Sequence, residues 1–190
     1  ITPVNLIVSR VGDGTSTLTS AATARFLDEY TPNGVFVQTI ALPTSVVGAQ
    51  RRLVDSGTAT SNGFVTQSAD GRYLLAAGYD AALGTTSITG SPSTTVNRVI
   101  ARIGLDGTID TTTALTDAYT GNNFRGVASV DGTSFWCSGT GTAPTPGVRF
   151  VAALGDSTSV QLSTTVTNIR CINIFGSQLH CSSASGAFQG

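Results

Sequence analysis

Few residues in this 190-residue chain are able to do chemistry. It contains one histidine, His180, three cysteines and no lysine, and Glu29 is its only glutamate. A serine hydrolase would need a nucleophile on a strained turn, and no Gly-x-Ser-x-Gly motif occurs. A catalytic zinc site would need several histidine or carboxylate ligands, and no histidine pair exists. The sequence therefore predicts no catalytic residue, no metal site and no cofactor, and it favours a packing role for His180 in a core or an interface.

The carboxylates are spread along the chain, and only Asp28 and Glu29 are adjacent. Paired carboxylates are the groups that hydrolyse glycosides. Neighbouring residues of a β-strand point to opposite faces of the sheet, so these two are not expected to converge on one substrate. The pair is therefore a weak argument for a glycosidase.

Several aspartates stand beside glycine, in short turns between segments rich in β-branched residues. A calcium loop needs carboxylates at alternate positions, as in Asp-x-Asp-x-Asp-Gly, and none of these turns has that pattern. Asp-Gly is instead a strong signal of a β-hairpin, because both residues tolerate the positive φ angles of a type I′ turn. The predicted turn residues are Asp70, Gly71, Asp106, Gly107, Asp131, Gly132 and Gly176.

The cysteines offer one candidate covalent link. Cys171 and Cys181 lie on the two strands of a hairpin expected around Gly176, and opposite positions in such a hairpin are close enough for a disulfide. Cys137 occupies the same place as Cys181 one repeat earlier, so a bond between repeats competes with the hairpin bond. A third alternative is that the thiols are free and buried.

Two loops have low complexity, at residues 84–95 and 139–147. Their mixture of serine, threonine and proline suits O-glycosylation in secreted proteins, and it equally suits plain solvated loops. No Asn-x-Ser/Thr sequence occurs, so N-glycosylation is not expected. The candidate O-glycosylation sites are Thr85, Thr86, Thr94, Thr95, Thr142 and Thr145.

The elements that position these residues form an internal repeat. One repeated pattern is a hairpin with a glycine turn. Aligning Gly71, Gly132 and Gly176 brings its three copies into register. A second pattern, Arg98–Gly104, matches Arg149–Gly155, and Arg25 begins a weaker copy. A threonine-rich strand follows each copy. The unit is thus four antiparallel strands, which is typical of a β-propeller blade.

We therefore expect an all-β fold, namely a segment of a β-propeller made of four-stranded antiparallel blades. A β-sandwich is the alternative, although it gives no reason for the same side chains to repeat. Residues 1–190 would form a single propeller-like domain or part of one, incomplete at both ends, with the first blade lacking its first strand and the last its last two. The approximate blades are 5–43, 63–115, 124–164 and 169–183.

One stretch resembles a known family. Residues 68–80, Ser-Ala-Asp-Gly-Arg-Tyr-Leu-Leu-Ala-Ala-Gly-Tyr-Asp, are similar to the first hairpin of WD-repeat-like bacterial propellers, which carry Ser-Pro-Asp-Gly followed by an apolar strand. Ala69 replaces the proline here, and the Trp-Asp dipeptide of true WD repeats is absent. The wider chain is similar to secreted propeller proteins of bacteria and algae. This resemblance implies a fold and a compartment, and it leaves the chemistry open.

The composition argues against two classes of function. Charged residues make up 11% of the chain and the formal net charge is −1, which argues against nucleic-acid binding. No apolar run is long enough for a membrane helix.

We expect a non-enzymatic extracellular or cell-surface module with a structural or interaction role. Its partners would be further copies, joined through open blade edges as in a fibril, or the remainder of a longer propeller. The alternative is a carbohydrate-binding or carbohydrate-active propeller, which should gather carboxylates and aromatic rings at the loop ends.

Overall fold

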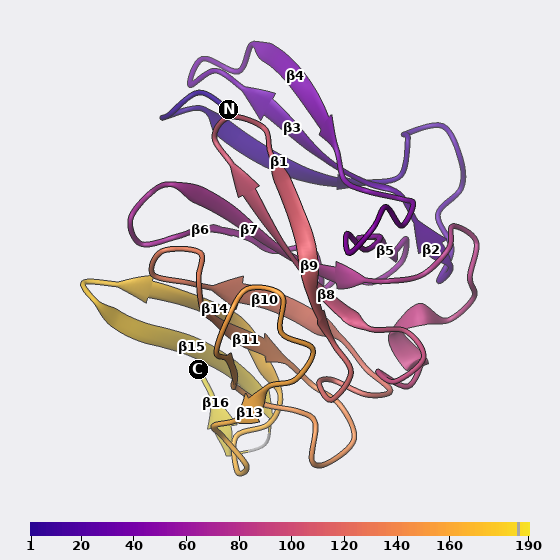
Figure 1. The fold of residues 1–190 in the computed structure, drawn as a ribbon, viewed down its shortest axis with the longest axis vertical. Helices are drawn as coiled ribbons and strands as arrows, with labels where there is room; N and C mark the ends of the chain where they lie inside the picture. The colour runs from indigo at the N-terminus through magenta and orange to yellow at the C-terminus, as the bar shows by residue number, and fades with distance from the viewer. Residues whose placement is uncertain (186) are drawn as a thin grey trace.

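The computed structural model describes residues 1–185 and 187–190, and nearly all of its regular structure is antiparallel β-sheet (Figure 1). Two sheets have four strands, two have three and one has two. In each of the four larger sheets the strands lie side by side in chain order. These sheets, here called blades 1 to 4, confirm the predicted all-β antiparallel fold, which fits an incomplete propeller and also the alternative of a sandwich.

The two central blades are complete. Each runs through four strands joined by successive antiparallel pairings. Blade 2 consists of β6 (Val65–Gln67), β7 (Tyr73–Tyr79), β8 (Arg98–Gly104) and β9 (Ile109–Leu115). Blade 3 consists of β10 (Phe124–Ala128), β11 (Phe135–Gly139), β12 (Arg149–Val151) and β13 (Val160–Gln161).

The terminal blades have three strands each. Blade 1 consists of β1 (Leu6–Val11), β3 (Arg25–Tyr30) and β4 (Phe36–Ala41). Blade 4 consists of β14 (Ile169–Phe175), β15 (Gln178–Ser185) and β16 (Phe188–Gln189). Blade 1 therefore has no counterpart of β6, β10 or β14, and in the described part of the chain the second edge of β1 has no partner strand. The short β16 goes beyond the two strands expected for blade 4.

Two small elements join the blades. β2 (Ala22–Thr23) pairs with β5 (Asp55–Ser56), and a 3-10 helix, η1 (Ile88–Gly90), lies in the long connection between β7 and β8. A two-residue strand is too short to show any hydrophobic alternation, which explains why the sequence does not predict β2 and β5.

The core is divided between the blades. Along β7, Leu74 and Ala76 belong to an apolar cluster shared with Leu27 of blade 1, whereas Leu75 and Ala77 belong to a cluster shared with blade 3. A third cluster joins blades 3 and 4. Because successive side chains of a strand point to opposite faces, an unbroken apolar strand such as β7 can be buried on both sides. Figure 1 shows the resulting succession, from blade 1 in indigo at one end to blade 4 in yellow at the other.

The Asp-Gly turns do not have the predicted type I′ geometry. Gly71, Gly107 and Gly132 have positive φ angles of 76°, 87° and 78°, but the preceding aspartates do not. The backbone N–H of Gly71 donates to the carbonyl of Ser68, three residues earlier. These are type I turns closed by a left-handed glycine. The aspartate instead accepts a backbone hydrogen bond from the residue two positions later, which is the ordinary Asx-turn role of this side chain.

The turn at Gly176 does have the type I′ geometry. Gly176 and Ser177 have φ angles of 54° and 65°, and they join Phe175 directly to Gln178. A two-residue loop with two positive φ angles matches the right-handed twist of the flanking strands. This is the tightest of the hairpins that the repeat alignment brings together.

A strained residue precedes β1. Val4 has a φ angle of 69° and stands two residues before its strand, where Gly71 stands before β7. A β-branched residue in the left-handed region costs about 1–3 kcal/mol, and the exposed Val4 side chain gains little packing in return.

Val4→Gly is therefore expected to raise the free energy of unfolding by about 0.5–1 kcal/mol after the entropy cost of glycine. Urea denaturation measures the difference. Val8→Gly, in the extended strand β1, is the matched control and should lower stability. A loss of stability in Val4→Gly would contradict the left-handed conformation.

Candidate functional site

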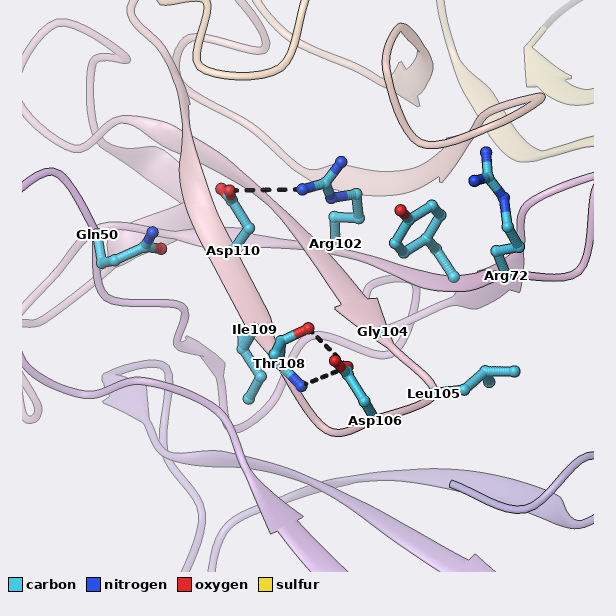
Figure 2. Close-up of a pocket in the computed structure, with 10 residues that line it drawn as sticks. Gln50, Arg72, Arg102, Gly104, Leu105, Asp106, Thr108, Ile109 and Asp110 are labelled. Atoms are coloured by element: carbon cyan, nitrogen blue, oxygen red, sulfur yellow. Dashed lines mark hydrogen bonds and ion pairs between the residues drawn. The ribbon is translucent and has the colours of Figure 1, made fainter.

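A polar cleft of about 390 Å³ lies at one end of blade 2, among the turns that close its hairpins (Figure 2). This volume falls within the range of roughly 300–1,000 Å³ that small-molecule sites occupy. The side chains that give the cleft its character are Arg72, Tyr73, Arg102, Asp106, Thr108, Asp110 and Gln50. Two guanidinium groups, two carboxylates and one aromatic ring thus meet at loop ends.

Strand register places the centre of this cleft. Arg102 on β8 lies directly opposite Asp110 on β9, and their side chains point toward each other in Figure 2. The Nη2 atom of Arg102 lies 3.8 Å from Oδ2 of Asp110, which is an ion pair at long range. Tyr73 begins β7, and its ring lies under two guanidinium groups, 4.8 Å from that of Arg102 and 5.4 Å from that of Arg72. Cation–π contacts on one ring fix both arginines in place.

The aspartates of the cleft are held by local hydrogen bonds. Oδ1 of Asp106 accepts from the hydroxyl and the backbone N–H of Thr108, at 2.7 and 3.0 Å, and these bonds lower the pKa of Asp106. Oδ1 of Asp110 accepts the same two kinds of bond from Thr112. The second oxygen of each carboxylate makes no hydrogen bond within the described part of the chain. Asp106 is therefore ionised at neutral pH and still has acceptor capacity.

Two side chains of the cleft also have hydrogen-bond donors without an acceptor in the described chain. Gln50 lines the cleft, its side-chain oxygen accepts from the backbone N–H of Thr111, and its amide nitrogen has no protein acceptor among the described residues. Nε of Arg72 donates to Asp70, and its two terminal nitrogens make no hydrogen bond in the described chain. Uncommitted donors and acceptors on a rigid frame are what a polar ligand needs.

The predicted turn residues contribute to this site in part. Asp106 lines the cleft, and Asp70 positions Arg72 from its edge. Gly132 of blade 3 packs against Tyr73 so closely that a Cβ would lie 2.7 Å from the ring. The other predicted turn residues, Gly71, Gly107, Asp131 and Gly176, shape hairpins. Sequence reasoning missed the cleft as a unit, although its arginines and tyrosine stand out once the blades are aligned.

A second, more apolar groove of about 410 Å³ lies between β6 and blade 4. Phe64, Phe175 and His180 line it, and the rings of Phe175 and His180 are 5.8 Å apart. His180 is exposed, so it does not lie in the core of this chain, and its expected role in an interface stays a prediction. The reason is that blade 4 packs only its other face against blade 3.

The predicted disulfide between Cys171 and Cys181 is also wrong, because all three cysteines are free thiols. A bulge between Ile169 and Ile172 shifts the register, so Cys181 lies opposite Ile172. Cys171 instead donates its backbone N–H to the hydroxyl of Ser182. The bond from Cys137 to Cys181 does not form either. Cys137 is buried, and burial raises the pKa of its thiol.

The threonine loops are accessible, but their glycosylation stays a prediction. Of the six candidates, all but Thr145 are exposed. The hydroxyls of Thr85, Thr95 and Thr145 donate to backbone carbonyls, which shapes the loops from within. Those of Thr86, Thr94 and Thr142 make no such bond within the described chain, so they are the better acceptors for a sugar.

Asp28 and Glu29 point to opposite faces of blade 1, as the strand pattern predicts. Asp28 pairs with Arg10 on the outer face at 2.6 Å. Glu29 is buried and accepts hydrogen bonds from Gln38, Thr2 and Asn5. The bond from Gln38 is the main cause that lowers the pKa of Glu29 to about 2.

This network predicts acid sensitivity. Because the pKa of Glu29 is lower in the folded chain than its ordinary value of about 4.3, its carboxylate stabilises the fold above that pH and the contribution is lost as the pH falls toward 2. The free energy of unfolding should therefore decrease between about pH 5 and 2, and less steeply in Glu29→Gln. Urea denaturation at a series of pH values measures both slopes. Equal slopes would contradict the role of Glu29.

Comparison of the chain with family models, curated proteins and solved structures finds no match. Within residues 1–185 and 187–190, no group of three or more histidine, cysteine or acidic residues is arranged to hold a metal ion. The same residues include no helix with the length and apolarity needed to cross a membrane.

Proposed function

We propose that this chain is a non-enzymatic extracellular or cell-surface module that associates with further copies through its terminal blades. The observation that carries this proposal is an exposed apolar row across the outer face of blade 1. Register places Leu6, Tyr30 and Phe36 side by side on its three strands. Leu6 is 58% and Phe36 54% exposed, and the neighbouring Val35 and Val37 of the same edge are also exposed. Contiguous apolar patches of this kind mark interaction surfaces.

Blade 4 has a comparable open face. Phe175 is 62% exposed and lies beside His180, and Phe188 of β16 is also exposed. The opposite face of blade 4 packs Ile172 and Leu179 against blade 3. Each end of the row of blades therefore presents a sheet face that its own chain does not cover.

The outer face of blade 1 is also pre-organised. Arg10 donates two hydrogen bonds to the carboxylate of Asp28, at 2.6 and 3.1 Å, and the hydroxyl of Thr39 donates a third at 2.7 Å. Arg10 also lies over the ring of Phe26, 4.6 Å from its centroid. A rigid face loses little conformational entropy on binding, which favours association.

The two open faces differ, so contact between them is head-to-tail. Such heterologous contacts close into a ring when the rotation allows, and otherwise they extend as a filament. Negative-stain electron microscopy of the purified chain tests this: rings or filaments are expected, and a field of single compact particles would contradict the proposal.

The resemblance of residues 68–80 to WD-repeat-like blades supports a place among the secreted propeller proteins of bacteria and algae. The antiparallel blade topology fits this assignment. So does a charged fraction of only 11% in a chain rich in serine and threonine. These features support an extracellular location.

A second function, carbohydrate binding, is favoured by the polar cleft of blade 2. Carboxylates, guanidinium groups and an aromatic residue gather there at the loop ends, which is the arrangement that a glycan-binding propeller should show. This function needs no catalytic step and is compatible with self-association.

A further inference from the structure

We propose that the cleft of blade 2 binds a neutral saccharide, with vicinal hydroxyls held between Arg102 and Asp110. This inference rests on the second function proposed above and specifies its site and ligand class. A guanidinium fork donates while a carboxylate accepts, so together they satisfy two adjacent hydroxyls of a sugar, each of which does both. At 3.8 Å the pair is too long for a hydrogen bond of its own, so each group keeps capacity for a ligand.

The residues of the cleft are not required by the blade. When Gly71 is aligned with Gly132, and Gly104 with Gly155, the positions of Arg72, Tyr73 and Arg102 in blade 3 hold Thr133, Ser134 and Ala153. Blade 3 forms the same four-stranded sheet without them. Tyr73 and Arg102 also pack against Gly132 of blade 3, but the four-stranded sheet itself does not require the polar groups that the cleft brings together.

The charges of the cleft favour a neutral ligand. Arg102 is balanced by Asp110, and Arg72 by Asp70 at 2.6 Å. Asp106, whose pKa is lowered by Thr108, completes a lining of two guanidinium groups and two carboxylates without net charge. Such a lining offers no net attraction to a sulfated or uronic-acid glycan, because charge complementarity between the partners is missing.

The side chains around the cleft are held in position by contacts within the protein. Tyr73 is fixed between the two arginines, and Nη1 of Arg102 donates to the carbonyl of Gly132 at 3.3 Å. Oδ1 of Asp110 is held by Thr112, which leaves Oδ2 directed toward Arg102. Because these polar groups are already ordered, binding a ligand costs little of their conformational entropy.

The test is a titration of the chain with cellohexaose, mannohexaose, xylohexaose and laminarihexaose, alongside a heparin hexasaccharide and a galacturonic-acid hexamer. Isothermal calorimetry and amide chemical shifts are the readouts. We expect saturable binding of a neutral oligosaccharide, with shifts concentrated at residues 72–73 and 102–110. The proposal would be overturned if the chain bound none of the neutral sugars or preferred an acidic one. It would also be overturned if the chemical shift changes were confined to other regions.

Asp110→Asn sharpens this test because the amide oxygen still accepts from Thr112. Losing the charge-assisted bond to the sugar should weaken binding about tenfold or more. Asp13→Asn is the matched control, since Asp13 accepts equivalent loop hydrogen bonds far from the cleft. Equal affinity in Asp110→Asn and the wild type would overturn the site.

Failure of this inference and failure of self-association are distinguishable. If the chain assembles but binds no sugar, the saccharide site is contradicted and the proposed association stands. If the chain binds sugar but stays monomeric, the association is contradicted and the saccharide site stands.

Discussion

Replacing Arg98 with alanine is expected to lower the free energy of unfolding by about 3–5 kcal/mol. The side chain is completely buried and donates to the carbonyls of Ser91, Val96 and Tyr119. Burial lowers its pKa to about 10, so it remains charged at neutral pH. The substitution would leave these carbonyls without a donor and open a cavity beside Tyr79. Urea denaturation followed by tryptophan fluorescence measures the loss.

Arg72→Ala is the matched control for stability. Its side chain is 62% exposed and pairs with Asp70 at the surface, where solvent screens the pair, so its removal should leave stability nearly unchanged. Similar losses in the two variants would contradict the structural role of Arg98. The first residue of the corresponding strand is Arg25 in blade 1 and Arg149 in blade 3, and both are buried and donate to backbone carbonyls.

Replacing Phe36 with aspartate is expected to weaken self-association by about 30-fold to 1,000-fold while the chain stays folded. The ring is exposed on the outer face of blade 1 and packs edge-on against Tyr30 at a centroid distance of 5.7 Å. Aromatic side chains at the centre of an interface contribute about 2–4 kcal/mol, and an introduced charge would be buried without a partner. Sedimentation equilibrium of the variant and the wild type measures the change.

Val160→Asp serves as the control for that substitution. Val160 is exposed on β13, the outermost strand of blade 3, and not on either open face. It adds the same charge but should leave association unchanged. If both variants dissociate the assembly equally, net charge is the cause and the outer face of blade 1 is not the interface.

The blades could be predicted because their signal is local and repeated. The Asp-Gly turns and the unbroken apolar run of β7 each mark a strand boundary or a doubly buried strand, and the repeat places them in register. The turn type could not be predicted, since Asp-Gly serves both a type I′ turn and a type I turn with a left-handed glycine. Which of them forms depends on loop length, and only Gly176 stands in a two-residue loop.

The surroundings of Cys181 and His180 depend on longer-range features. A bulge in β14 places Ile172 opposite Cys181, and a bulge leaves no clear mark in the sequence. His180 lies outside the core because blade 4 contributes only one face to the described core, and its role in an interface stays a prediction.

The cleft escaped prediction because its residues come from separate turns. Arg102 and Asp110 face each other across one hairpin, but Arg72 comes from an earlier turn, and the three meet only through the register of β7, β8 and β9. Their repeat positions do carry a signal: charge and aromaticity in blade 2 where blade 3 has small residues.

Sedimentation velocity of the purified 190-residue chain across a wide concentration range tests the central claim most directly. Association through the open faces of blades 1 and 4 predicts species larger than one chain, and their proportion should grow with concentration. In Phe36→Asp these larger species should be lost, which leaves a single slowly sedimenting boundary. A compact monomer at every concentration would contradict it.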